Sequence, residues 1–183
     1  MGCAITAGYL EPNCITVTVG TSRTDIWLFN TDEIASYTET VPGEIDAFTM
    51  DTTANYNYKL SIKKKSGRLY QEKQEDDGGG ISYTQGFEFT IASSDTAARN
   101  FVDSLNGVNL TVVVRRSDDT FDVIGLDEGV SLMTMTESTA SGELGYNCGL
   151  VGEEFSYVTK KFYDTDLATT ITTLDTPSDM KRI

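Results

Sequence analysis

The feature that most constrains the fold is a single helical segment, residues 94–106, in a chain whose other segments alternate like strands. Its apolar residues, Ala98, Phe101, Val102 and Leu105, recur at the spacing of one helix face. Ser93 or Ser94 can act as the N-cap with Asp95 in the first turn, and Asn106-Gly107 ends the segment. We therefore expect one amphipathic helix whose apolar stripe covers a sheet.

The remaining chain favours strands. It contains 26 Thr, nine Tyr and eight Phe, and these residue types suit the half-buried face of an antiparallel sheet. The sequence predicts a mainly β fold, an antiparallel sandwich or barrel in a single domain. Within this domain we expect an N-terminal extension with strands at 1–55, the β core with the helix at 56–162, and a tail or edge strand at 163–183. Residues 31–37 are expected to form a loop with a helical turn. The strands are expected at residues 15–19, 25–30, 45–50, 57–63, 81–91, 110–115, 120–126, 131–137 and 153–162.

A long charged insertion, residues 63–80, separates two of the clearest strands. It is too long for a tight turn and too charged for a core, so we expect a projecting hairpin or loop that contacts a neighbouring subunit, with lysines on one limb facing acids on the other. A merely mobile hairpin is the alternative. The triple glycine at 78–80 fits neither a P-loop nor a dinucleotide-binding motif, and indicates a pivot. The charged residues assigned to this arm are Lys63, Lys64, Lys65, Arg68, Glu72, Glu75, Asp76 and Asp77.

The net charge of −14 is unevenly distributed, with −7 over residues 1–55, +2 over residues 56–116 and −9 over residues 117–183. This balance argues against sequence-specific binding of nucleic acid, because such binding relies on Lys and Arg to neutralise phosphates. It is compatible with a wall along which nucleic acid slides. A more general role for the acids, keeping the protein soluble, is the alternative.

No set of residues indicates catalysis, a metal or a cofactor. Histidine is absent, so the usual zinc sites and a Ser/His or Cys/His nucleophile pair are excluded, and the acids at 118–122 and 164–166 lack the pattern of an EF-hand loop. Cys3, Cys14 and Cys148 are expected to be reduced thiols. The N-terminus lacks the pattern of a secretory signal, and no apolar run approaches a membrane span, so we expect no membrane insertion.

The segments after the predicted helix are punctuated by glycines. They read F-D-V-I-G at 121–125, G-V-S-L at 129–132, G-E-L-G-Y-N at 142–147 and G-L-V-G at 149–152. In this order, from residue 56 to residue 158, and without catalytic residues, the chain resembles the tail tube proteins of tailed phages. The resemblance implies a structural virion protein, made in the host cytoplasm, that forms homo-oligomeric rings, expected to be hexameric. These rings would stack around a channel through which DNA passes without specific binding, and would contact other tail or neck proteins.

Residues 1–55 and the Thr-rich end have no counterpart in this resemblance. Three alternatives therefore stay open: a ring protein of the head-to-tail connector or tail terminator, a contractile injection tube, and a non-enzymatic β-sandwich binding module such as an adhesin domain. Rings or polymers would distinguish the ring-forming classes from the binding module. We further expect acids to line the passage for nucleic acid.

Overall fold

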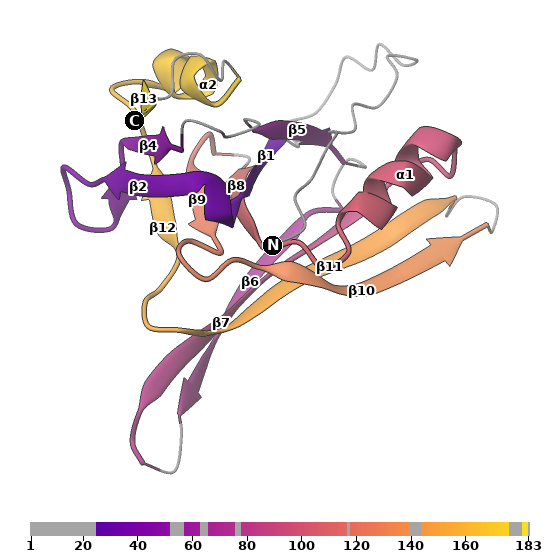
Figure 1. Ribbon diagram of the computed structural model, residues 1–183, viewed down its shortest axis with the longest axis horizontal. Coiled ribbons are helices and arrows are strands. Elements are labelled where there is room, and N and C mark those ends of the chain that lie inside the picture. Colours follow the sequence, from indigo (N-terminus) through magenta and orange to yellow (C-terminus); the bar gives the residue numbers. More distant parts are fainter. Residues whose placement is uncertain are drawn as a thin grey trace.

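Three layers of secondary structure make up the protein in a computed structural model, which describes residues 25–51, 57–62, 66–75, 78–116, 118–139, 144–175 and 181–182 (Figure 1). The predicted fold class is confirmed: the protein is mainly β, with antiparallel sheets in a sandwich and a flanking helix. The predicted strand at residues 15–19, Cys3 and Cys14 lie outside the described residues.

A six-stranded sheet forms the middle layer, a four-stranded sheet the second and a three-stranded sheet the third. In spatial order, the first contains β3 (Glu44–Ile45), β12 (Lys160–Phe162), β9 (Phe121–Ile124), β8 (Leu110–Arg115), β1 (Asp25–Asn30) and β5 (Tyr58–Ser61). The four-stranded sheet has the order β10 (Ser131–Ser138), β11 (Gly145–Phe155), β7 (Ile81–Ile91) and β6 (Arg68–Glu75). The three-stranded sheet has the order β13 (Lys181–Arg182), β4 (Ala47–Met50) and β2 (Ile34–Thr38).

The six-stranded sheet is buried on both faces, as β1 illustrates. Ile26 and Leu28 point into the core shared with the four-stranded sheet, whereas Trp27 and Phe29 point into the core shared with the third layer. Because successive side chains of a strand point to opposite faces, a strand between two cores is apolar at most of its positions. This explains the continuous apolar run in this strand and confirms its predicted burial on both faces.

The predicted helix is α1 (Thr96–Ser104), and its four stripe residues, Ala98, Phe101, Val102 and Leu105, are buried in the core beside the four-stranded sheet. Its N-cap is Asp95, whose carboxylate accepts a hydrogen bond from Ala98 N at 2.7 Å. The expected N-caps at Ser93 and Ser94 are therefore wrong. Asp95 lies three residues before the amide that needs an acceptor, and Ser93 Oγ instead accepts from Asp95 N at 3.2 Å.

The C-terminal region contains a second helix, α2 (Leu167–Asp175), where a tail or edge strand was expected. The strand was expected because Thr favours strands. In α2, however, the hydroxyls of Thr170 and Thr172 donate to carbonyls four residues earlier, which accommodates Thr within a helix. Asp166 accepts from Thr169 N at 2.8 Å, and Leu174 is buried in the third-layer core. Only the two residues of β13 form an edge strand, parallel to β4.

Two other predicted segments are divided differently in the structure. Residues 31–37 form η1 (Thr31–Glu33) and then enter β2, so the expected loop is only its first turn. The expected strands at 45–50 and 153–162 each contribute to two sheets: β3 and β4 separate at Asp46, and β11 and β12 are separated by the segment around Tyr157.

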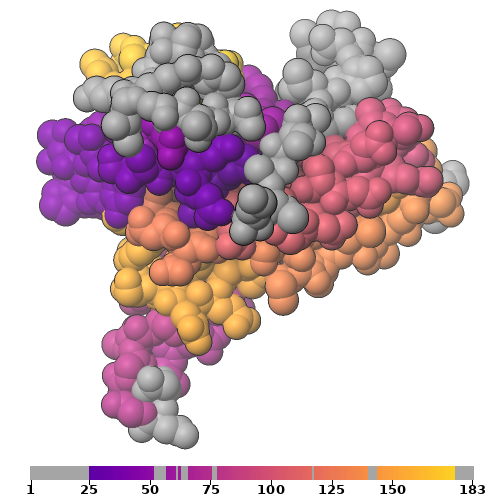
Figure 2. All heavy atoms as spheres, in the orientation of Figure 1, coloured from indigo at the N-terminus to yellow at the C-terminus, as the bar shows by residue number. Residues whose placement is uncertain are grey.

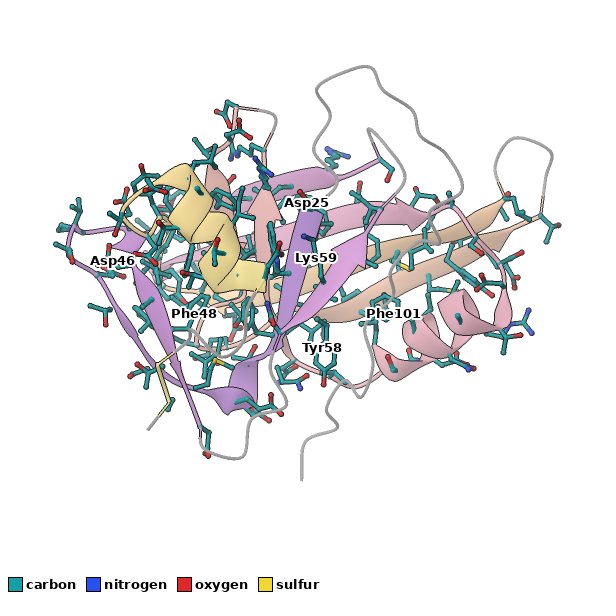
Figure 3. The ribbon with its side chains drawn as sticks, turned by 90° about the horizontal axis from the view of Figure 1, so that it is seen from above. Asp25, Asp46, Phe48, Tyr58, Lys59 and Phe101 are labelled. Carbon is teal, nitrogen blue, oxygen red and sulfur yellow. The ribbon has the colours of Figure 1, made fainter. Side chains whose placement is uncertain are left out.

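Polar contacts attach the third layer to the rest of the protein. At one end of α2, Asp175 accepts from Trp27 Nε1 and Lys59 Nζ, both at 2.8 Å, and the Lys59 ammonium lies 5.2 Å from the Trp27 ring centroid. Lys160 of β12, in the six-stranded sheet, donates to Glu39, which follows β2 of the third layer, and this hydrogen bond lowers the pKa of the Glu39 carboxyl. The view in Figure 3 places Asp46 and Phe48 in the part of the molecule near α2, and Phe101 at the opposite end.

Gly125 occupies a position that a larger residue fits poorly. Its φ is +71°, and a Cβ placed there would lie 2.4 Å from the backbone oxygen of Leu110. Gly107 has nearly the same φ, +72°, but open space around it. We expect Gly125→Ala to lower the free energy of unfolding by about 1–3 kcal/mol more than Gly107→Ala, because only the former adds a clash with backbone. Urea denaturation of both variants measures this difference, and equal losses would contradict it.

Candidate assembly surface

The charged insertion supplies β6, which forms a long hairpin with the flanking strand β7 that stands away from the body, as Figure 2 shows. The other flanking strand, β5, lies in the six-stranded sheet. The predicted projecting hairpin is thus present. Its strands pair from Arg68 opposite Glu88 to Glu75 opposite Ile81, so β6 faces the first part of β7. Glu72 and Glu75 lie opposite Thr84 and Ile81, so these two acids do not face lysines across the hairpin as expected. Lys63, Lys64, Lys65, Asp76 and Asp77 lie outside the described residues.

One face of the four-stranded sheet is covered and the other is open. The six-stranded sheet and α1 lie on the same side of it in Figure 1, and the side chains that point there form the shared core. We call the opposite side the open face. By strand register, its members are Arg68, Tyr70, Glu72 and Gln74 on β6, Ser82, Thr84, Gly86, Glu88 and Thr90 on β7, Asn147, Gly149 and Val151 on β11, and Ser131, Thr134 and Thr136 on β10.

Polar contacts between neighbouring strands organise the open face. Thr90 Oγ1 donates to Asn147 Oδ1 at 2.7 Å, and an Arg68 nitrogen lies 3.5 Å from a Glu88 oxygen. The side chains of Arg68 and Glu88 are 72% and 50% exposed, so this ion pair adds little stability. Burial of the Tyr70 ring raises its pKa, and the carboxylates of Glu88 and Glu72 raise it further.

Two glycines shape the open face by leaving room for their neighbours. A Cβ on Gly86 would lie 2.2 Å from the Tyr70 ring, and a Cβ on Gly149 would lie 2.4 Å from Thr134 Oγ1. The Tyr70 ring therefore lies over the backbone of the adjacent strand. Beside Gly149, a shallow hollow of about 310 Å³ is lined by residues that include Glu88, Thr134 and Asn147.

The two outer strands of this sheet, β6 and β10, have no strand partner on their outer edges among the described residues. Each strand is eight residues long. β10 carries no charge before Glu137, and its Met133 and Met135 are 64% and 47% exposed. Unpaired backbone groups on a long neutral edge favour pairing with another strand, and proteins normally protect such edges with Lys, Pro or a cover. Met133 and Met135 were not among the predicted contact residues, although the uncharged run S-L-M-T-M-T was a usable signal.

Nothing in the described part of the chain indicates a catalytic or metal site. There is no group of three Asp, Glu, Cys or His side chains arranged to hold a metal ion within those residues. Cys148 is buried in the core, and burial raises the pKa of its thiol to about 12, so its thiolate is scarce at neutral pH. Across the same residues, the helices are too short or too polar to cross a membrane.

Comparison of the chain with models of protein families, with curated proteins and with solved structures gave no match.

Proposed function

We propose that this protein is a structural subunit that forms closed rings through the edges of its four-stranded sheet, and that the rings stack into a phage tail tube. The observation that carries this proposal is the pair of open edges, β6 and β10, on one sheet. A contact between two different surfaces of identical subunits produces a ring when the rotation closes.

The strand directions fit such a contact. β10 is antiparallel to β11, β11 to β7 and β7 to β6, so β10 and β6 of one subunit run in opposite directions. Rotation about an axis roughly along the strands leaves their directions unchanged. The β6 edge of one copy would therefore meet the β10 edge of the next as another antiparallel pair, and the alternation would continue around the ring.

The offset between the edges fits a closed sheet as well. β6 pairs directly with residues 81–88 of β7. β10 pairs with β11, and following the register of β11 on β7 places β10 at the height of residues 86–91. The centres of β6 and β10 are therefore offset along the strands by about four residues, or roughly 14 Å. Four strands spaced by about 4.8 Å make each subunit about 19 Å wide. If this offset is repeated in every subunit, the strands tilt by about 35–40° from the ring axis. Closed sheets typically tilt by about 35–45°.

The body of each subunit would then lie outside the ring, because it occupies only the covered face of the sheet. The open face would line the central channel. Six subunits would supply 24 strands, and with a strand spacing of about 4.8 Å and a tilt of about 35–40° the backbone diameter would be about 45 Å. The resemblance of the sequence to tail tube proteins supports passage of DNA through such a channel.

The projecting hairpin supports stacking of the rings. The pairing between β7 and β11 ends at Tyr83 opposite Phe155, whereas β6 and β7 continue to Glu75 and Ile81. Even with strands tilted by about 35–40° from the proposed ring axis, the hairpin rises along that axis, so its end would extend beyond one ring and reach the next. A connector or terminator ring has less need of this extension.

Placing a lysine at the β10 edge should prevent ring formation. Met135 is 47% exposed, so Met135→Lys should fold normally, while its charge opposes burial of the edge against a neighbour. Val41→Lys is the matched control, because Val41 is 53% exposed and lies between β2 and β3, away from the four-stranded sheet and both of its edges. Light scattering after size exclusion should show monomers for Met135→Lys and rings for Val41→Lys. Rings of Met135→Lys with normal stability would contradict the proposed contact.

A further inference from the structure

Acidic side chains are concentrated on the side of the protein opposite the open face. Residues 31–51 and 163–175, which supply β2, β4 and α2, contain nine Asp or Glu and no Lys or Arg, and β13 adds Lys181 and Arg182 to the same layer. Among the described residues, Lys160 neutralises Glu39 and Lys59 neutralises Asp175. These segments lie on the far side of the six-stranded sheet from the four-stranded sheet (Figure 1).

The open face, in contrast, has few charges. Its charged side chains are Arg68, Glu72 and Glu88, and Arg68 pairs with Glu88. Most of its other side chains are hydroxyls or amides, such as Thr84, Thr90 and Asn147. Apolar area on this face is confined to one end, where Val151 and the exposed Met133 line a hollow together with Ser131. Elsewhere Tyr70 covers Gly86, and the face offers little apolar area for another protein.

We infer that the channel wall contacts passing duplex DNA through hydroxyl and amide groups, and that the acidic layer faces outward. This inference rests on the proposed ring, in which the open face lines the channel. It differs from the expectation that acids line the passage. A hydroxyl or amide wall forms weak hydrogen bonds that exchange readily with water, and it lacks the cations whose binding to phosphates would hold DNA.

Three variants of the full-length chain test the inference. Asn147→Lys adds a cation to the open face at an exposed position of an inner strand, opposite Thr90 and Thr136. Thr172→Lys adds the same charge at an exposed position of α2, in the acidic layer. Glu72→Gln removes the open-face acid that is opposite Thr84 and has no charge across the strand. Rings of each are assembled with a short linear DNA duplex, checked by electron microscopy and sedimented at low and high salt.

We expect wild-type, Glu72→Gln and Thr172→Lys rings to retain no duplex, and Asn147→Lys rings to retain it at low salt. If six lysines each contact a phosphate, the affinity should fall by about 10³-fold between 50 and 200 mM salt. Retention by Glu72→Gln would mean that acids repel the duplex, and would overturn the inference. So would equal retention by Thr172→Lys and Asn147→Lys, or none by Asn147→Lys. Absence of rings in the wild type would instead contradict the proposed function.

Discussion

Shortening the β6–β7 hairpin should yield rings that no longer stack into tubes. Replacing residues 74–82 with Asn-Gly joins Lys73 to Tyr83, which are directly opposite each other, through a two-residue turn that suits a hairpin. The removed residues include Glu75 and the exposed Ile81, but none of the buried core residues. The sheet and its two edges should therefore remain largely intact, while the contact with the next ring is lost.

Electron microscopy distinguishes the outcomes of this change. Wild-type protein should form tubes, and the shortened variant should form single rings of the same diameter. A control replaces Ile81, which is 52% exposed, with Thr and keeps the full hairpin length, and it should still form tubes. Long tubes from the shortened variant would show that the hairpin does not join the rings.

Phe101→Ala should cause the largest loss of stability among single substitutions in α1. Phe101 is 3% exposed and belongs to the core between the helix and the two larger sheets. Truncating a buried Phe to Ala typically costs about 3–5 kcal/mol, through lost burial and the cavity that remains. This is a large part of the roughly 5–15 kcal/mol by which a domain is stable.

Thermal and urea denaturation of Phe101→Ala measure this loss, with Asn100→Ala as the control. Asn100 lies on the exposed side of the same helix, and its substitution should change the free energy of unfolding by about 0.5 kcal/mol or less. Similar effects of the two substitutions would mean that the Phe101 side chain contributes little to the core.

Local periodicity was enough to predict α1, four strands of the middle layer (β1, β5, β8 and β9) and β7 of the hairpin. The stripe from Ala98 to Leu105 has helical spacing, and the alternation in residues 81–91 matches β7. The second helix was missed because its Thr residues favoured a strand. The sequence also contained a helix signal, namely Asp166 as an N-terminal cap followed by apolar residues at 167, 171 and 174.

The open edges and the separation of charge could not be predicted from the sequence. Whether β10 is an edge depends on which strands pair, and the partners of β7 come from segments more than 50 residues apart along the chain. In the sequence, the acidic residues at 31–51 are part of an excess of Asp and Glu over Lys and Arg that extends over much of the chain. Their position opposite the open face follows only from the stacking of the three layers.

The mass of the purified wild-type protein tests most directly whether copies join through the β6 and β10 edges. Multi-angle light scattering on freshly purified protein, with electron microscopy of the same fractions, gives both the mass and the shape of the assembly. We expect closed rings whose mass is a whole multiple of 20.0 kDa, six copies in the proposed arrangement, together with stacks of these rings. A single species of 20.0 kDa at every concentration, with no rings in the microscope, would contradict the proposal.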